Sequence, residues 1–552
     1  MLEGFDLNAV QDLDQAREAI RHLLNLVEEL AAENRTLRAE VQQLRDELRR
    51  LKGGSGRPTF PQTRPAAEAS PADHSSERER RASKARQRRA KVSAIQIDRE
   101  EVLPVDRAGL PADAQFKGYE PVVVQDLRLQ TDHVRFWKEK FYSETAQRTY
   151  LAELPAGYTG EFGPGLRALA LVLYFGGQMT EPKMVDLFRH AGVQISSGQV
   201  SNLLIKDHVP FHAEKEAVYV AGLQSSPWQH LDDTGSPVAG ANHHCHVVDN
   251  PLHTTFITTP AKDRLTIIDV LRHGQPRVFR LNTEALGYLE TAGVSGKTRA
   301  KVAALLSEQD RDEATMQTWV DAHLPGLGTQ TRKWLLDAAA VAAYHAQTEW
   351  PVVRLLICDG ALQFTWVTED LALCWVHEGR FYKKLLPVVP QHQQLLDDFL
   401  GKFWEFYRAL LAYRTQPIPA ERTRLTGIFE TLFATVTGYQ ALDERIALTR
   451  AKQASLLLVL DHPEIPLHNN PAELGARQRV RKRDISFGNR TAEGTQAWDT
   501  FMSLAATAKK LGVNFYQYLH DRISGAHRVP NLADLINERA KTLKLGASWN
   551  TS

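Results

Sequence analysis

Residues 228–259 read WQHLDDTGSPVAGANHHCHVVDNPLHTTFITT. Three segments of this stretch are rich in β-branched residues and are separated by turn residues, so we predict three consecutive strands. A helical segment, RLTIIDVLRHG, follows Asp263 and ends at Gly274. Farther along, PVVRLLICDGALQF (351–364) contains an apolar run typical of a buried strand, and LALCWVHEG (371–379) is another short strand candidate. Together these segments predict an α/β fold.

Composition limits the class of protein. The 552 residues include 67 Lys and Arg against 66 Asp and Glu, a net charge of +1, which argues against a uniformly basic nucleic-acid coat. The 3 cysteines contain no CxxC pair, so a disulfide framework and a cysteine-rich zinc module are excluded. The first residues do not resemble a signal peptide, and no run of 18 apolar residues occurs. We expect a cytoplasmic, nucleoid-associated protein with no membrane partner.

A heptad repeat runs through residues 20–52. Leucines occupy one heptad position, d, and the positions three residues earlier, a, hold Ile20, Val27, Asn34, Val41 and Leu48. Leucine at d with β-branched residues and one Asn at a favours two parallel helices, and Glu33, Glu40 and Glu47 would face Arg38, Arg45 and Lys52 of a partner. The alternative is an amphipathic helix packed on its own domain. We predict a homodimeric coiled coil through Leu23, Leu30, Asn34, Leu37, Leu44 and Leu51.

A Gly-, Pro- and Ser-rich linker, residues 53–76, separates this helix from a basic arm. Such an arm neutralises phosphates without reading sequence, although a solvated polar tail is the simpler interpretation. A basic-zipper transcription factor is excluded, because its basic helix runs directly into the N-terminal end of the zipper. The arm comprises Arg78, Arg80, Arg81, Lys84, Arg86, Arg88, Arg89 and Lys91.

Residues 164–207 predict three helices broken at glycines, the second ending at Gly192 and the third capped by Ser196 or Ser197. A short glycine turn before a Ser-capped helix is typical of a helix-turn-helix, in which Gln199, Asn202 and Lys206 would contact DNA. A packing role for this helical hairpin is the equally good alternative.

Carboxylates lie at the ends of the predicted buried strands, at Asp232 and Asp359, and in the first turn of a helix that begins near Pro471, at Glu473. An unpaired buried charge costs several kcal/mol, whereas carboxylates that share Mg²⁺ are stabilised. Spacing alone is a weak argument, since either Asp could cap a turn.

The segments WQHLDDTGSP (228–237), ICDGALQF (357–364) and LCWVHEGRFYKKL (373–385) occur in this order in the sequence. They resemble the first-aspartate strand, the second-aspartate strand and the C-W-x-H segment of the insertion-sequence sixty-six transposases, bacterial DDE enzymes with a ribonuclease-H-like core. The closing stretch from IPLHNNPAELGARQRVRKRD to NFYQYL resembles their D-N-N-x-A-E-R block and the helix after it. The blocks match in order over residues 160–525, and an N-terminal coiled coil suits the family.

By position, the resemblance implies a catalytic triad of Asp232, Asp359 and Glu473 that binds two Mg²⁺ or Mn²⁺ ions. It also places His377, Asn469 and Asn470 on family motif positions, which we assign to DNA contact. Three features depart from the family: residues 100–158 lack its zinc-binding cysteines, so no zinc is predicted, His468 replaces an Asp, and Leu474-Gly475 replaces Arg-Ala.

A basic run follows Glu473 by one helical turn. Because it adjoins the metal-site candidate, we favour phosphate contact over a solvated face for Arg477, Arg479, Arg481, Lys482 and Arg483, with Lys383 and Lys384 extending the surface. The aromatic stripe of Phe403, Trp404, Phe406 and Tyr407 is instead predicted to be a helix core.

These patterns predict a dimeric transposase that binds double-stranded DNA at element ends and target, cuts it and joins the strands, with possible accessory proteins of the same element. A catalytically inactive DNA-binding regulator and a metal-dependent nuclease without strand joining remain alternatives. The expected regions are a coiled coil (1–52), a linker and arm (53–98), a small domain replacing the zinc module (99–160), a helical DNA-binding region (161–225), the catalytic core (226–490) with helical insertions at about 282–350 and 391–460, and a C-terminal helical region (491–552).

Overall fold

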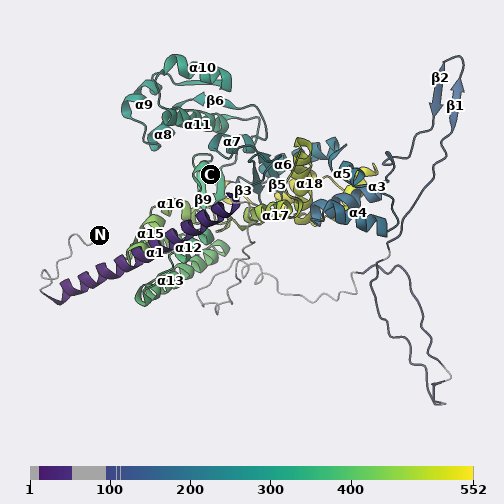
Figure 1. The fold of residues 1–552 in the computed structure, drawn as a ribbon, viewed down its shortest axis with the longest axis horizontal. Coiled ribbons are helices and arrows are strands. Elements are labelled where there is room, and N and C mark those ends of the chain that lie inside the picture. Colours follow the sequence, from purple (N-terminus) through teal and green to yellow (C-terminus); the bar gives the residue numbers. More distant parts are fainter. Residues whose placement is uncertain (1–11, 52–94, 107–108, 112, 128, 551–552) are drawn as a thin grey trace.

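A computed structural model describes residues 12–51, 95–106, 109–111, 113–127 and 129–550. Its central element is a five-stranded mixed sheet in the order β5-β4-β3-β8-β9 (Figure 1). The mixed α/β class predicted from the sequence is therefore confirmed. The strands are β3 (Trp228–Gly235), β4 (His244–Asp249), β5 (Thr254–Thr259), β8 (Leu355–Cys358) and β9 (Asp370–Leu373).

The strand directions divide the sheet into two parts. β3, β4 and β5 pair antiparallel as a meander, as expected from the turn residues between them. β8 pairs parallel to β3 and to β9, and all four residues of β8 are buried. The three predicted strands of 228–259 and the buried strand before Asp359 are confirmed.

Helices cover both faces of the sheet. Neighbouring strand residues point to opposite sides, and apolar side chains on each side need a core to pack into. Val247 packs into a core formed with the N-terminal and C-terminal helices, and Val248 packs into a second core on the other face. The first of these cores includes α6 (Val209–Gln224), α17 (Asn470–Ser486), α18 (Ala492–Lys510), α19 (Phe515–Ile523) and α20 (Leu532–Leu543), and a short turn of helix, η7 (Ala547–Asn550), ends the described chain.

The predicted helices of 164–207 are present, and they pack against α18 and α19. Gly192 adopts φ +93° after the second helix, and Ser196 caps the third through a reciprocal pair of hydrogen bonds with Gln199. The elements are α3 (Pro164–Leu171), the π-helical turn η4 (Val172–Gly176), α4 (Glu181–His190) and α5 (Ser197–Ile205).

The first insertion is not purely helical, contrary to the prediction for 282–350. Strand β7 (Ser307–Asp312) lies within it and pairs antiparallel with β6 (Val278–Leu281). The polar sequence SEQDRD is mostly exposed, so no apolar alternation marked this strand. The helices of this lobe are α7 (Arg264–Leu271), α8 (Thr283–Thr291), α9 (Gly296–Ala303), α10 (Glu313–His323) and α11 (Thr329–Ala346).

The second insertion is helical, as predicted, and its aromatic stripe of Phe403, Trp404, Phe406 and Tyr407 is buried in a third core. This core also receives Trp228, Leu355 and Ile357 from the sheet. Its helices are α13 (Pro390–Thr415), α14 (Pro419–Leu432), α15 (Gln440–Arg450), α16 (Gln453–Leu456) and the 3₁₀ turn η6 (Leu458–Leu460).

The segment LALCWVHEG divides between two elements, whereas we predicted one strand. β9 ends at Leu373, and helix α12 (Trp375–Lys383) begins with Cys374 as its N-cap, whose Sγ accepts a hydrogen bond from the His377 amide (3.4 Å). A 3₁₀ turn, η5 (Leu362–Phe364), similarly follows β8.

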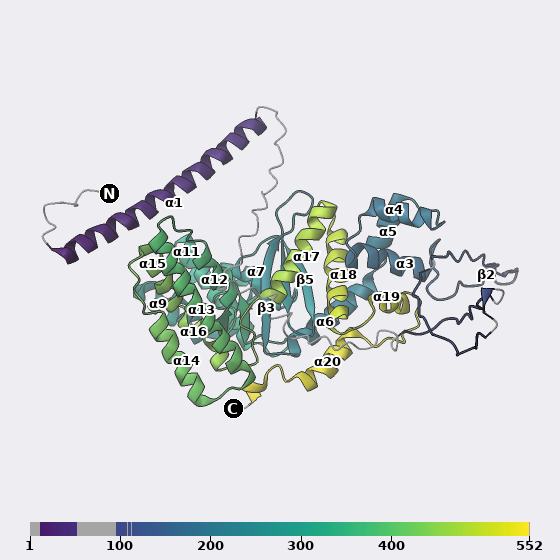
Figure 2. The same ribbon diagram turned by 90° about the horizontal axis from the view of Figure 1, so that it is seen from below.

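The heptad repeat forms a single helix, α1 (Leu13–Leu51), which lies beside the helical insertion in both views (Figures 1 and 2). At the other end of the molecule, β1 (Lys140–Ser143) and β2 (Arg148–Leu151) form an exposed hairpin (Figure 1). The basic arm 78–91 lies outside the described residues. Within the described part of the chain, no helix is long and apolar enough to cross a membrane.

Candidate active site

Three carboxylates reach one region from three distant parts of the sequence. Asp232 lies on β3, Asp359 follows β8 directly, and Glu473 is in the first turn of α17. The last paired residues of β3 and β8 are His230 and Ile357, so extending this parallel register by two residues brings Asp232 level with Asp359.

Two residues set the position of α17 against the sheet. A Cβ on Gly475 would stand 2.6 Å from Cγ1 of Val247, so only glycine permits this close approach to β4. Asn469 joins the start of the helix to β3, since its Nδ2 donates to the Leu231 carbonyl (2.9 Å) and its Oδ1 lies 3.0 Å from Nδ1 of His230. The helix that carries Glu473 is thereby fixed to the strand that carries Asp232.

The electrostatics of Asp232 show that the three carboxylates interact. Burial, together with the charges of Asp359 and Glu473, raises the pKa of Asp232 to about 7, against the effect of the Asp233 amide, which donates to Oδ1 (2.9 Å). Because burial is the largest cause of this shift, a cation bound beside Asp232 would lower the pKa again. The side chain of Asp359 accepts from the Ala361 amide (3.0 Å), as in a capped turn.

Glu473 has one oxygen engaged and one without a partner. Arg380 donates from Nη2 to Oε2 (2.9 Å), whereas Oε1 is buried without a hydrogen bond and stands 4.0 Å from Nδ1 of His377. Burial would raise the pKa of Glu473, but the adjacent His377 and Arg380 more than offset it, so the pKa is lowered.

The carboxylates are close enough to repel but do not converge on one point. Among the described residues, no three His, Cys, Asp or Glu side chains are grouped at metal-binding distances. Glu473 is directed to Arg380, and Asp233 is engaged by Nζ of Lys262 (3.1 Å) and Nε2 of Gln363 (2.9 Å).

The basic run on α17 divides between surface and interior. Arg477 and Arg481 are exposed and Arg483 is half-buried, so these three remain available for phosphate contact. Arg479 and Lys482 are fully buried, which makes their predicted DNA contact wrong. Arg479 pairs with Asp499 (3.2 Å), and Nζ of Lys482 donates to the Tyr174 carbonyl (2.9 Å).

The predicted DNA contacts of Asn469 and Asn470 are also wrong, because both residues are buried at the start of α17. On α5, Asn202 and Lys206 are exposed, whereas Gln199 is occupied by the capping box and by Glu161 (2.6 Å). Lys383 and Lys384 are exposed at the end of α12, and His377 faces Glu473.

Sequence reasoning missed Arg380, Lys262 and Gln363. Arg380 follows His377 by three residues, which places both on one face of a helix. Had WVHEGR been assigned to a helix, this spacing would have indicated the pair. Lys262 contacts Asp233 from the segment before α7, and Gln363 does so from the 3₁₀ turn η5; no local pattern brings these two segments together.

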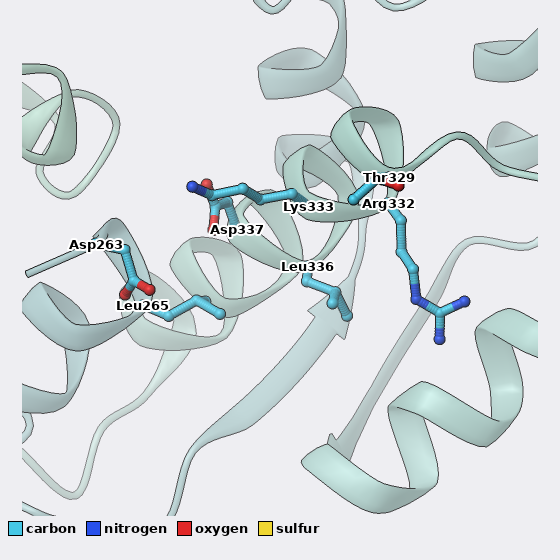
Figure 3. Close-up of a pocket in the computed structure, with 7 residues that line it drawn as sticks. All are labelled: Asp263, Leu265, Thr329, Arg332, Lys333, Leu336 and Asp337. Atoms are coloured by element: carbon cyan, nitrogen blue, oxygen red, sulfur yellow. The ribbon is translucent and has the colours of Figure 1, made fainter. Parts of the chain in front are cut away.

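A cavity between the start of α7 and α11 lies apart from these groups (Figure 3). None of the predicted site residues lines it. Its carboxylates have structural partners: Asp337 accepts from Nη1 of Arg264 (2.6 Å), and Asp263 caps α7 through the Thr266 amide (2.9 Å). The lining residues are Asp263, Leu265, Thr329, Arg332, Lys333, Leu336 and Asp337.

Comparison with curated proteins finds similarity to a protein of Sinorhizobium fredii. The chain is 32% identical over 329 residues to "Uncharacterized protein y4jO" of Sinorhizobium fredii (strain NBRC 101917 / NGR234), an alignment that covers 58% of this chain and 99% of that protein. No protein-family model matches the chain, and no solved structure matches it.

Proposed function

Since the chain belongs to the same family as the Sinorhizobium fredii protein y4jO, whose name assigns no activity, we propose a function from the residues of the chain itself. The protein is a DNA transposase of the insertion-sequence sixty-six type. It binds element ends and target as a homodimer, and it cleaves and joins strands by in-line phosphoryl transfer.

The order of the strands supports a ribonuclease-H-like core. Three antiparallel strands followed in space by two parallel ones, in the order β5-β4-β3-β8-β9, is the arrangement such a core requires. In this order Asp232 lies on β3 and Asp359 directly follows the neighbouring strand β8, so two members of the proposed triad come from adjacent strands.

The observation that carries the proposal is the group of carboxylates without sufficient counter-charge. Asp232 has a raised pKa, and Oε1 of Glu473 is buried without a hydrogen bond. Their carboxylate oxygens are the ligands that Mg²⁺ or Mn²⁺ prefers. The three side chains would have to move closer together to share an ion, because they are not grouped at metal-binding distances among the described residues. Asp232, Asp359 and Glu473 would hold the ions. When bound, two such ions stabilise the attacking and leaving oxygens of an in-line displacement at phosphorus.

The remaining residues bind and position DNA in this proposal. Arg477 and Arg481 extend along the exposed side of α17 from the carboxylates and would contact phosphates, as would Lys383 and Lys384 on α12. Lys262, 48% exposed, adds a further cation beside Asp233. No covalent protein intermediate is proposed, and the thiol nearest Asp359, Cys358, is fully buried with a raised pKa.

The test is an end-cleavage and strand-transfer assay. Purified protein is incubated with Mg²⁺ or Mn²⁺ and labelled DNA containing the sequences that flank its gene. Asp359→Asn should reduce cleavage and joining by about a thousandfold, because it removes a carboxylate ligand of the ions that would stabilise the transition state. Asp484→Asn, an exposed change on α17, is the matched control. Cleavage and joining by Asp359→Asn at the wild-type level would contradict the proposal.

One observation favours a second candidate, a non-catalytic DNA-binding regulator. Arg380 already forms an ion pair with Glu473, so less negative charge remains at the three carboxylates to attract a metal ion. The same assay separates the candidates: a regulator shifts end DNA in gels without cutting it, a nuclease cuts without joining, and a transposase does both.

A further inference from the structure

The inner face of α1 is attached to the helical insertion through a buried carboxylate. Glu28 is only 6% exposed, although it lies on a surface helix. Its Oε1 accepts from the amides of Val388 (2.9 Å) and Val389 (2.8 Å), and its Oε2 accepts from Val388 (3.0 Å). A side chain from the N-terminal helix therefore binds backbone 360 residues away in the sequence.

This contact supplies what helix α13 lacks. The N-cap of α13 is Val389, which has no side-chain acceptor, and Pro390 follows it. Backbone amides at a helix start need acceptors, and negative charge there is favourable. Glu28 provides both. The His392 ring, whose Nδ1 lies 3.3 Å from Oε1 of Glu28, stacks on Tyr439 beside this contact.

A second attachment lies one turn earlier on α1. Nδ2 of Asn25 donates to the Gly438 carbonyl (3.0 Å), and its Oδ1 accepts from the Gln440 amide (3.0 Å) at the start of α15. Gly438 adopts φ +85°, and a Cβ there would stand 3.0 Å from Cδ of Arg21. Arg21, Asn25 and Glu28 thus form one contact face at spacings of four and three residues.

The opposite face of α1 is apolar and exposed. In the heptad, Arg21 and Glu28 occupy b and Asn25 occupies f, whereas the a and d positions form a separate stripe. Helix positions b and f lie away from the a and d stripe, so the attachment leaves the stripe uncovered. Its exposed members are Ile20, Leu23, Val27, Leu30, Leu37, Val41, Leu44 and Leu48.

We propose that α1 uses both faces at once: in its own chain it caps α13, and its a and d stripe binds a second copy of this chain. Such a stripe on a monomer marks an interface, and the pairing of Glu33 with Arg38 and Glu40 with Arg45 selects a parallel copy as its occupant. The inference rests on the homodimer of the proposed function and is independent of its chemistry.

The attachment connects the dimer axis to the carboxylates. α12 packs closely on α13, since a Cβ on Gly379 would stand 2.6 Å from Cζ2 of Trp404. On α12, Arg380 contacts Glu473. Through α1, α13 and α12, the two copies hold their carboxylate groups at a fixed separation, which suits a protein that acts on two DNA ends.

The test uses the full chain and two measurements, sedimentation for the dimer and hydrogen–deuterium exchange for the peptide containing Val388 and Val389. Glu28→Ala should leave the dimer intact and speed exchange at these amides by about tenfold, the value of one net hydrogen bond. Glu28→Gln should give a smaller increase. Glu29→Ala, the matched control at the exposed neighbouring position, should change neither measurement.

Leu30→Glu with Leu37→Glu should give the opposite result: monomers in sedimentation, with exchange at Val388 and Val389 unchanged. Wild-type monomers, or dimers that survive this double substitution, would overturn the outer-face interface. Loss of protection at Val388 and Val389 in the monomer would show that the cap comes from the other copy. Unchanged exchange in Glu28→Ala would overturn the cap. None of these outcomes depends on strand cleavage.

Discussion

Two groups of buried charge meet helix α17 within two turns, one around Glu473 and one around Arg479, and they differ in how completely their charges are paired. The Arg479 guanidinium donates to Oγ of Ser236 (3.1 Å) and Oγ1 of Thr258 (2.8 Å), pairs with Asp499 and lies over the Trp498 ring (4.7 Å). By contrast, the carboxylate group at the start of the helix includes a buried oxygen without a hydrogen bond and a carboxyl whose pKa is about 7.

This difference in charge pairing distinguishes a structural role for the Arg479 group from a functional role for the carboxylate group. A balanced buried charge needs nothing more and stabilises the packing of α17 on α18 and the sheet. An unbalanced group costs stability and is retained where a ligand supplies the missing charge. Substitutions in the Arg479 group should therefore lower the stability of the protein, whereas substitutions in the carboxylate group should lower activity and raise stability.

The largest expected effect comes from removing the balanced cation. Arg479→Met should lower the free energy of unfolding by about 3–5 kcal/mol, because Asp499 would remain buried without its partner. Urea denaturation measures this loss. Arg477→Met, an exposed change two residues earlier on the same helix, should stay within about 0.5 kcal/mol of wild type. Equal effects of the two changes would remove the distinction between buried and exposed arginines.

The carboxylates provide the next comparison, because the same chemical change should act in opposite directions. Asp499→Asn should destabilise the protein by several kcal/mol, on the scale of a broken buried ion pair. Asp232→Asn should stabilise the metal-free protein by about 1–2 kcal/mol, since it removes a buried charge repelled by Asp359 and Glu473. Denaturation at pH 8 with a chelator measures both. Destabilisation by Asp232→Asn would mean that this carboxylate is already balanced.

The sheet could be predicted from the sequence because its strands are marked by local patterns. Alternation and turn residues gave the strands of 228–259, and the apolar run before Asp359 gave β8. The polar strand β7 and helix α12 could not be obtained this way. β7 has no apolar face, and the apolar start of α12 imitates a strand although its Cys374 cap begins a helix.

The site could be predicted only in part for a related reason. The proximity of Asp232 and Asp359 could be predicted because each lies near the end of a predicted strand, and the position of Glu473 could be predicted because it lies at the start of a predicted helix. Burial of Arg479 and Lys482 depends on Asp499, Tyr174 and Trp498, which approach from other parts of the chain. A run of basic residues therefore resembles a DNA surface in the sequence even where two of its five residues, Arg479 and Lys482, face the core.

Lys482 tests whether the basic group is completely balanced. Burial lowers the pKa of Lys482 to about 7 from its usual 10.5, against the opposing effect of Glu181. Between these values the unfolded chain binds a proton that the folded chain lacks, so stability rises with pH and is lost as pH falls toward 7. The contribution is about 1.4 kcal/mol per pH unit.

Lys482→Met should remove this dependence. The wild-type free energy of unfolding minus that of the variant should increase by about 2 kcal/mol from pH 7.5 to 9.0 in urea denaturation. Lys509→Met, an exposed change on α18, should show no such difference. A constant difference for Lys482→Met would indicate that Glu181 keeps the lysine charged, and the basic group would then be fully balanced.

The smallest expected effect concerns Arg380, the residue that partly balances the carboxylates. Its side chain is 43% exposed, so Arg380→Ala should change stability by less than about 1 kcal/mol in the absence of metal. If a divalent ion and Arg380 compete for Glu473, the Mg²⁺ concentration that half-maximally raises the melting temperature should fall by about fivefold in the variant, because an exposed ion pair is worth up to about 1 kcal/mol.

Three results of this titration have different meanings, with Lys384→Ala as the control on the same helix. A lower midpoint in Arg380→Ala alone shows that the arginine substitutes for the ion at Glu473. A higher midpoint shows that Arg380 orients Glu473 for the ion, since freeing the carboxylate then costs affinity. No response of the wild-type or variant protein to Mg²⁺ would leave the carboxylates without their proposed ligand, and the contrast between the two ends of α17 would lose its functional explanation.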